Sequence, residues 1–342
     1  MRNFFIAIAA GALLIAGCGG KSVIPAGNFA GSASDLHGRG VHAAAMTITE
    51  MPVPQSSSGP TGVTMGPDGN IWFTEYFKNS IAVFNVTTSK IKRFKIATSN
   101  ARPAGIVTGP DGNLWFTESL GNKIGKITPT GTITEYPINI AKSDPIGITV
   151  GADGNLWVTE LDGNRLVSLN PTTGALTGYL VPTAHSHPAF ITLGPDGALW
   201  FTENTAGKIG RFSHGFQEFT LATGANPEGI VSGPDGNLWF TDDALSQVDK
   251  ITTSGVVTAY PTLTAGAVPS RITVGPSDLG PAALWFTEST ANNIGEVTTA
   301  GVVSEFPVST PASGLTGIAL GPNNTLWFTE HIANKLGTVS GI

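Results

Sequence analysis

The stretch that decides the fold is GPDGNLWFTE at residues 109–118, in which a turn precedes a strand-like run carrying Trp115. The same pattern surrounds every tryptophan of the chain. These tryptophans lie 39 to 46 residues apart and are Trp72, Trp115, Trp157, Trp200, Trp239, Trp285 and Trp327. A repeat of about 42 residues built from short strands is typical of a β-propeller with one blade per repeat. The sequence therefore predicts an all-β protein, a seven-bladed propeller.

One repeat, residues 103–138, contains four strand-like runs at 105–108, 114–118, 123–127 and 132–137. Turn residues separate the runs: Pro110 fixes φ at its position, and Gly112 supplies a residue that tolerates positive φ. Alternation of β-branched and aromatic residues predicts four antiparallel strands per blade. The recurring Asp-Gly pair has too few acidic neighbours for a calcium loop, so we expect a plain hairpin turn.

The two ends of the repeat region complement each other. Residues 47–52, TITEMP, are a copy of the fourth strand that stands alone ahead of the first complete repeat. The last repeat has a third strand at residues 335–339 and no fourth strand. We expect the N-terminal strand to complete the last blade and close the ring, which removes exposed sheet edges. The propeller should span residues 47–342.

The N-terminal segment reads as an export signal. Arg2 precedes an apolar run over residues 4–16, which is too short for a comfortable membrane span. The sequence IAGC at residues 15–18 resembles the signal of bacterial lipoproteins. That resemblance implies a signal peptide at 1–17, acylation of Cys18, and a flexible tether over 18–46. It places the protein in the bacterial cell envelope, exported and anchored to a membrane through its lipid.

Composition excludes several functions. The net charge is −6 and Lys and Arg are not clustered, whereas nucleic-acid binding needs a basic surface. Cys18 is the sole cysteine, so the propeller has neither a disulfide within the chain nor a thiolate metal site. We expect a monomer that binds a small-molecule or protein ligand at the mouth of its central channel and contacts a membrane only through the lipid.

A carboxylate ends the second strand of every repeat, at the face where propeller channels open. These residues are Glu75, Glu118, Glu160, Glu203, Asp242, Glu288 and Glu330. A ring of this kind could hold a divalent metal such as magnesium or calcium, with Glu288 and Glu330 as the candidate ligands. Alternatively, each carboxylate accepts hydrogen bonds that join neighbouring blades. The sevenfold recurrence favours the second interpretation, because a catalytic site needs one or two individual carboxylates.

Departures from the repeat indicate where a site lies. Each inner strand starts with a Pro-x-Gly-Ile pattern; its second position is charged at Glu228, and its glycine is replaced in two blades. The candidate ligand-binding residues are Glu228, Asp242, Asp243, Arg271 and Phe190, and the candidate catalytic residues are Glu228, Arg271 and His331. The alternative is an ion-pair cluster that satisfies itself. His185 and His187 lie in a Ser/Thr-rich loop and are expected to be solvated.

The complete repeat, PxGIxxGPDGNLWFTE followed by NKIGKIT and TITEYP, resembles the streptogramin B lyases (virginiamycin B lyase family) over residues 47–342. The resemblance implies a metal-dependent elimination that opens the ester of a cyclic depsipeptide antibiotic. In the family a histidine base stands at the position of Thr316, and a second histidine contacts substrate at the position of Ser270. Neither residue is histidine here. A threonine hydroxyl does not abstract a carbon-bound proton near neutral pH without its own base.

We therefore expect a binding module that lacks the catalytic histidines of the family. Two alternatives remain open at this point. One is a metal-dependent carbon-oxygen lyase with a relocated site on the channel-mouth face. The other is a lactonase-like hydrolase that uses a calcium ion held by the ring of carboxylates. Fold alone does not decide among them, since propellers host many unrelated functions.

Overall fold

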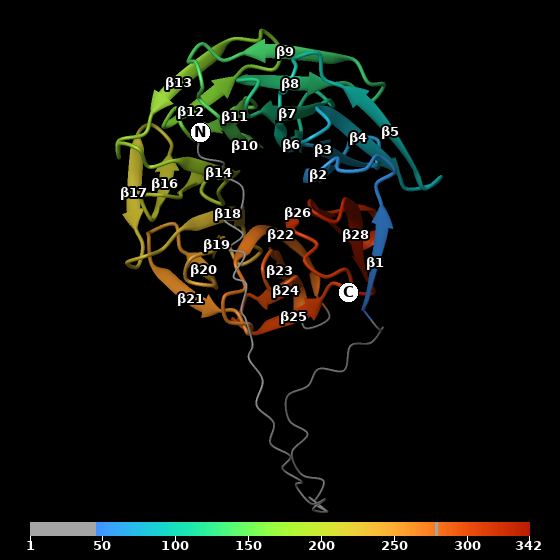
Figure 1. Cartoon of the computed structure of the whole chain (residues 1–342). Helices are drawn as coiled ribbons and strands as arrows, with labels where there is room; N and C mark the ends of the chain where they lie inside the picture. The colour runs from blue at the N-terminus through green and yellow to red at the C-terminus, as the bar shows by residue number, and fades with distance from the viewer. Residues whose placement is uncertain (1–45, 278–279) are drawn as a thin grey trace, which may run out of the picture. The chain divides into compact units, whose positions relative to one another are not determined.

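A computed structural model of the chain describes residues 46–277 and 280–342. These residues form seven four-stranded antiparallel sheets arranged around a central axis (Figure 1). The predicted seven-bladed, all-β propeller is confirmed. The expected signal peptide, Cys18 and most of the tether lie outside the described residues.

Within each blade the chain runs from the axis outward. The innermost strands are β2 (Pro60–Met65), β6 (Pro103–Thr108), β10 (Pro145–Val150), β14 (Pro188–Leu193), β18 (Pro227–Ser232), β22 (Pro269–Ser277) and β26 (Leu315–Leu320). The second strands are β3 (Ile71–Glu75), β7 (Leu114–Glu118), β11 (Leu156–Glu160), β15 (Leu199–Glu203), β19 (Leu238–Asp242), β23 (Gly280–Glu288) and β27 (Leu326–Glu330).

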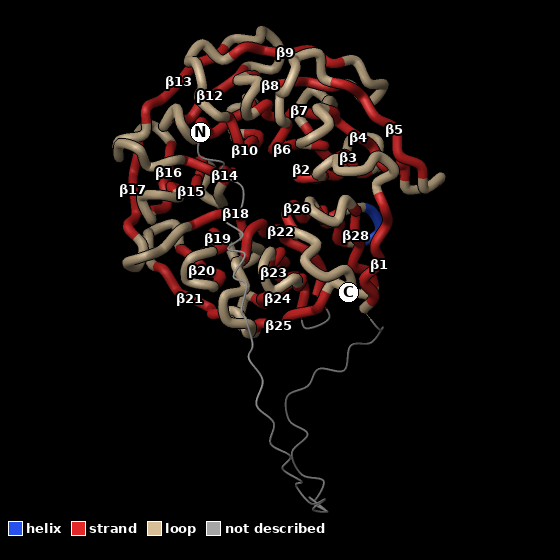
Figure 2. Tube along the Cα trace, in the orientation of Figure 1, coloured by secondary structure: helices blue, strands red, loops and turns tan. Residues whose placement is uncertain are grey.

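The outer half of each blade follows the same order. The third strands are β4 (Ser80–Asn85), β8 (Lys123–Ile127), β12 (Arg165–Leu169), β16 (Lys208–Phe212), β20 (Gln247–Ile251), β24 (Asn293–Thr298) and β28 (Lys335–Ser340). The outer strands are β5 (Lys90–Lys95), β9 (Ile133–Pro137), β13 (Leu176–Leu180), β17 (Phe216–Thr220), β21 (Val257–Pro261), β25 (Val303–Pro307) and β1 (Thr47–Pro52). Strands dominate the described chain (Figure 2), and its one helix is the short 3₁₀ turn Pro322–Asn324. None of the described segments forms a helix long and apolar enough to cross a membrane.

The first strand of the propeller completes the last blade. β1 pairs antiparallel with β28 over six residue pairs, from Thr47 opposite Ser340 to Pro52 opposite Lys335. In Figure 1 the blue strand β1 accordingly lies beside the red strand β28. The predicted closure of the ring by the N-terminal strand is confirmed, and no edge of that blade's third strand is left unpaired.

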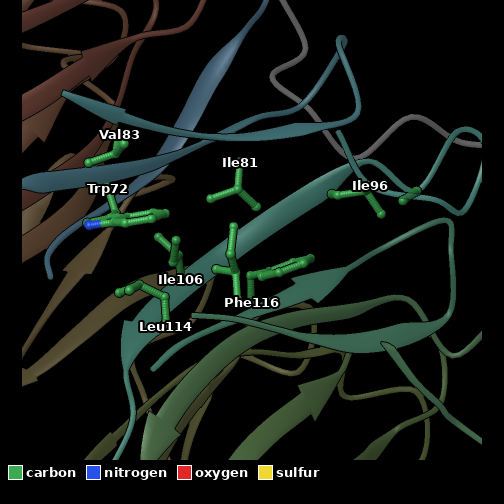
Figure 3. Close-up of a cluster of buried hydrophobic side chains, with 9 residues drawn as sticks. Trp72, Ile81, Val83, Ile96, Ile106, Leu114 and Phe116 are labelled. Atoms are coloured by element: carbon green, nitrogen blue, oxygen red, sulfur yellow. The ribbon is translucent and has the colours of Figure 1, made fainter. Parts of the chain in front are cut away.

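The tryptophans form the core between blades, and none is more than 6% exposed. Trp72 of blade 1 packs against Ile106 and Leu114 of blade 2 (Figure 3). In blades 1 to 5 the indole N–H donates to the aspartate of the Asp-Gly turn, as in the 2.9 Å bond from Trp115 to Asp111. The turn aspartate is therefore fixed by the tryptophan, in agreement with the interpretation as a plain turn.

A buried threonine in each second strand joins neighbouring blades. In blade 2, the Thr117 hydroxyl accepts a hydrogen bond from the Gly105 N–H at 2.9 Å and donates to the Ile146 carbonyl of blade 3 at 2.9 Å. The N–H contact recurs in all seven blades, at Thr74, Thr117, Thr159, Thr202, Thr241, Thr287 and Thr329. The contact with the next inner strand occurs in six of them. We call this arrangement the threonine clamp.

The carboxylates that end the second strands are fully buried, and those of blades 1, 2, 4, 6 and 7 face residues of the outer strands. In blade 2, Glu118 faces Glu135 of β9, which also accepts the Thr98 N–H of the linker from blade 1 at 3.2 Å. Burial and the neighbouring Glu135 raise the pKa of Glu118 to about 8. Although burial acts in the opposite direction, hydrogen bonds from Thr98 and the charge of Lys123 lower the pKa of Glu135. The pair therefore shares one proton near neutral pH.

Three other blades repeat this pair. The pKa is raised to about 7 for Glu203 and to about 8 for Glu288 and Glu330, which face Glu218, Glu305 and Glu50 respectively. The carboxyl groups of Glu75, Glu118, Glu203, Glu288 and Glu330 thus meet residues of the outer strands of their own blades, which agrees with the interpretation that such carboxylates have structural contacts. There the carboxyl groups hold the linkers that lead into these blades.

Removing one hydroxyl of the threonine clamp should destabilise the propeller. Thr159→Val keeps the shape of the side chain but leaves the Gly147 N–H and the Ala189 C=O, now at 2.9 and 2.7 Å from the hydroxyl, without their partner. We expect a loss of about 2–4 kcal/mol in the free energy of unfolding, measured in urea. Thr159→Ser retains the hydroxyl and should lose only about 1 kcal/mol. Equal losses for the two variants would contradict the clamp.

Neutralising a paired carboxyl group should change how stability depends on pH. The folded pKa of Glu118, about 8, lies above its unfolded value, so the wild type loses stability as the pH rises from about 4.5 to 8. Glu118→Gln removes this titration, and its stability relative to wild type should rise by on the order of 2 kcal/mol between pH 5 and pH 8. Thermal unfolding at several pH values measures the difference.

Glu75→Gln is the matched control at the same position of blade 1. Glu75 accepts two hydrogen bonds of 2.8 Å from Arg93, so its replacement breaks an ion pair. Burial raises the pKa of Glu75, but the hydrogen bond and charge of Arg93 oppose the rise, so this variant should gain clearly less stability relative to wild type between pH 5 and pH 8 than Glu118→Gln. An equal gain in both variants would show that any neutral residue is preferred there, and that the carboxyl pair is not the cause.

Candidate functional site

The central axis contains a cavity of about 150 Å³ lined by residues from the innermost strand of every blade. Most of the lining consists of glycines and of isoleucines or valine. Where glycine stands at these positions, the neighbouring blade is close: a Cβ on Gly62 would lie 2.3 Å from the Ala104 carbonyl oxygen. Phe190 and Arg271 stand at the equivalent position in blades 4 and 6, and their side chains enter the cavity. We call the end of the cavity where the inner strands start the mouth.

Arg271 is held by groups from two other blades. Its Nη1 donates to Glu228 Oε2 at 3.0 Å, and its Cζ lies 3.4 Å from the centroid of the Phe190 ring. Glu228 Oε1 accepts a hydrogen bond of 2.9 Å from Asn204. The side chains of Arg271 and Glu228 are 24% and 22% exposed, so the pair is accessible from the cavity. Cation–π stacking and the ion pair together fix the planar guanidinium.

Asp243 belongs to the same cluster, and Asp242 does not. Burial and the nearby Glu228 raise the pKa of Asp243 to about 7. Asp242 is fully buried and accepts hydrogen bonds from the backbone N–H groups of Asn226 and Leu245, both at 3.1 Å. These bonds fix the loops on either side of it. The structure thus brings together four of the five predicted ligand-binding residues, and Asn204 joins them although the sequence analysis left it out.

His331 lies on the opposite side of the mouth, close to blade 1. Its Nδ1 is 3.0 Å from the Thr61 hydroxyl, and its ring lies 4.9 Å from the ring of Phe77. Burial lowers the pKa of His331, so the imidazole is neutral near pH 7. The guanidinium of Arg102 stacks on Tyr76 and Phe77 at 4.8 and 5.0 Å. Phe77 is 52% exposed, which leaves an aromatic surface open to solvent.

A third group of titratable residues lies between blades 2 and 4. Burial and the charge of Asp162 raise the pKa of Asp144 to about 7. His187 contacts the Thr205 hydroxyl at 2.7 Å, and its Nε2 lies 3.9 Å from Asp162 Oδ1. His187 is therefore half-buried with polar contacts, whereas His185 is exposed as expected. Arg102, Asp144 and His187 all directly precede the proline of an inner strand, a shared position that the sequence already displayed.

The two positions that carry histidine in the resembled family have other surroundings here. Thr316 is 5% exposed, and its hydroxyl lies 2.8 Å from the Thr329 hydroxyl of the clamp. The Ser270 hydroxyl lies 3.4 Å from Arg271 Nη1. Among residues 46–277 and 280–342, no three His, Cys, Asp or Glu side chains are placed to hold a metal ion together. The metal candidates Glu288 and Glu330 lie in the outward-facing carboxyl pairs described above.

Comparison with known proteins places the chain among the lyases that its repeat resembles. A sequence model of the Virginiamycin B lyase family matches residues 46–223 and 213–341. A solved structure described as a streptogramin B lyase is 37% identical, with a TM-score of 0.81 over 86% of this chain and 97% of that chain. A catalytically inactive virginiamycin B lyase from Staphylococcus aureus, solved with quinupristin, is 36% identical, with a TM-score of 0.81 over 86% and 99% of the two chains.

More distant structures share the fold alone. Hydrazine synthase from Kuenenia stuttgartiensis is 15% identical, with a TM-score of 0.69 over 84% of this chain and 97% of that chain. A search among curated proteins finds no match to the sequence. The family match spans nearly all of the propeller and agrees with the structural likeness, so the chain belongs to the virginiamycin B lyase family.

Proposed function

We propose that this propeller binds a ligand at its mouth and does not open streptogramin B antibiotics by the elimination used in its family. The observation that carries the proposal is the cluster of Arg271, Glu228, Phe190, Asp243 and Asn204, which we call the Arg271 cluster. Arg271 and Phe190 replace two glycines of the axial cavity, and Glu228 holds the guanidinium in place. A fixed, partly exposed cation with a carboxylate beside it is suited to recognition of a polar group on a ligand.

The second side of the mouth adds apolar contacts. Phe77 and Tyr76, with Arg102 stacked on them, offer an aromatic surface in the loop after β3 of blade 1, away from the charged cluster in blades 4 to 6. A ligand that spans both sides needs a polar group and an aromatic or aliphatic group, as peptide-like small molecules and protein loops have. The relative from Staphylococcus aureus was solved with quinupristin, which makes this compound the first probe to test.

Binding can be tested with two matched arginine variants. Arg271→Gln removes the cation of the mouth. Arg211→Gln removes a cation of blade 4 that pairs with Asp196 and stacks on Trp200, at the end of that blade away from the mouth. We expect a ligand found by thermal-shift screening, with quinupristin included, to stabilise wild type and Arg211→Gln. Its affinity for Arg271→Gln should fall by about tenfold or more, because a charge-assisted contact is worth ~1.5–3 kcal/mol. Equal affinities for both variants would place the binding site elsewhere.

The catalytic part of the proposal rests on proton transfer. The elimination needs a base poised near neutral pH, and the buried Thr316 hydroxyl contacts only neutral groups. We expect the purified chain to leave quinupristin intact when it is incubated with magnesium and followed by mass spectrometry. Loss of a general base typically lowers the rate ~10²–10⁴-fold.

A metal-dependent lyase with a relocated base is the second candidate function. His331 supports it, because the imidazole is neutral and lies at the rim of the mouth. Magnesium-dependent opening of quinupristin that is lost in His331→Ala but kept in His214→Ala would establish this function in place of the binding function. His214 is a suitable control because it is exposed.

We also propose that the protein is exported and anchored to a membrane through Cys18. The apolar run at residues 4–16 and the sequence IAGC at 15–18 support the proposal. Several acyl chains together anchor a protein stably to a membrane, and without the Cys18 thiol the protein would not be acylated. Cys18→Ser should move the protein from the membrane fraction to the soluble fraction after cell fractionation. An unchanged distribution would contradict the lipoprotein assignment.

A further inference from the structure

Blade 3 differs from other blades at its outer edge. In blades 2, 4, 6 and 7 the outer strand carries a glutamate opposite a glycine of the third strand, as Glu135 stands opposite Gly125. In blade 3 this position of the outer strand is Gly178, opposite Val167. The carboxylate that would face Glu160 and hold the linker into this blade is therefore missing from the chain itself.

A cavity of about 120 Å³ lies at this place, lined among others by Ile140, Glu160, Arg165 and Gly178. Glu160 is fully buried, and neither of its carboxyl oxygens accepts a hydrogen bond of ordinary geometry from the described residues. The same holds for Glu118, Glu203 and Glu330, but each of these faces a glutamate of its outer strand, and Glu160 does not. The Nε of Arg165 is also buried without an acceptor. Buried polar groups are normally paired, so these groups mark a site for a polar ligand.

Blade 2 shows which ligand the same framework accepts. There the Glu135 carboxylate receives the N–H of Thr98 at 3.2 Å, lies 3.5 Å from Lys123 Nζ, and faces Glu118. The equivalent residues of blade 3 are Ile140, Arg165 and Glu160. Ile140 and Thr98 lie the same number of residues before the proline of their inner strands. Arg165 stands opposite Glu160 in blade 3 as Lys123 stands opposite Glu118 in blade 2.

We propose that the cavity of blade 3 binds a small monocarboxylate of about the size of acetate, which replaces the missing outer-strand glutamate. The guanidinium of Arg165 donates to the carboxylate, and its planar fork matches two oxygens in one plane. The Ile140 N–H and the Glu160 carboxyl group complete the contacts. Burial raises the pKa of Glu160, which favours the protonated, donating form beside a bound anion.

The proposal can be tested by titrating the full chain with sodium acetate at pH 6 in a calorimeter. Sodium chloride and sodium sulfate at equal ionic strength serve as comparison anions. We expect one saturable acetate site with a Kd on the order of 1 mM, since a ligand of few atoms has a limited binding free energy. Sulfate should bind at least tenfold more weakly, because its second charge is unpaired beside Glu160. Absence of saturable acetate binding, or equal binding of the three anions, would overturn the proposal.

Two variants locate the site. Gly178→Glu supplies a carboxylate from the chain, and the end of the flexible Arg165 side chain must shift to admit it; acetate affinity should fall at least tenfold. Thr177→Glu adds the same charge on the exposed neighbour of the same strand and should change the affinity by less than about twofold. Equal affinities in these variants would place the site elsewhere. If Gly178→Glu does not fold, Arg165→Gln decides: an undiminished affinity there overturns the assignment.

Discussion

The propeller depends on the threonine clamp. A strand that approaches its neighbour blade near the axis needs a hydrogen-bond partner for each buried backbone group, and the clamp threonines are fully buried. The threonine hydroxyl provides a partner for two such groups: it accepts a hydrogen bond from one N–H of its own blade and donates one to a carbonyl of the next blade. Since the hydroxyl is fixed by both contacts, the distance between inner strands is fixed as well.

This constraint explains the pattern at the start of each inner strand. The neighbouring carbonyl comes so close that a side chain at Gly62, Gly105 or Gly317 would collide with it. The clamp uses only backbone atoms of the inner strand, however. Phe190 and Arg271 keep the N–H bond to their threonine, at 3.0 and 3.1 Å, while their side chains extend into the axial cavity. Side chains at the mouth can therefore vary without loss of the ring.

The repeat made the fold predictable, and it made only part of the site predictable. Trp115 and the turn around Asp111 fix the strands, because their contacts are local and recur in most blades. Glu228 and Arg271 stood out because they break the repeat, and the structure pairs them at 3.0 Å. The direction of Glu118 was not predictable, since strand periodicity gives the face of a residue and not whether its side chain meets Glu135 or the axis.

The contacts of the residues that directly precede inner-strand prolines were not predicted, for a different reason. Arg102, Asp144 and His187 have positive φ values of 53°, a backbone conformation that non-glycine residues seldom adopt. No sequence pattern marks this conformation, yet it turns these side chains towards the second-strand loop of the neighbouring blade, where Tyr76 and Asp162 stand. The mouth is formed by loops from neighbouring blades, and the repeat pattern does not show which of their side chains meet.

The distribution of titratable groups around the mouth bears on its chemistry. Asp144 and Asp243 both have pKa values near 7, so these two carboxyl groups titrate at physiological pH, whereas burial lowers the pKa of His331 and keeps it neutral. Each group has neighbours of its own: the charge of Asp162 acts on Asp144, that of Glu228 acts on Asp243, and His331 contacts Thr61. General acid–base catalysis requires the acid and the base to reach one reacting centre. Groups held apart around an axial cavity do not meet at one centre, which supports the proposed binding function over the catalytic one.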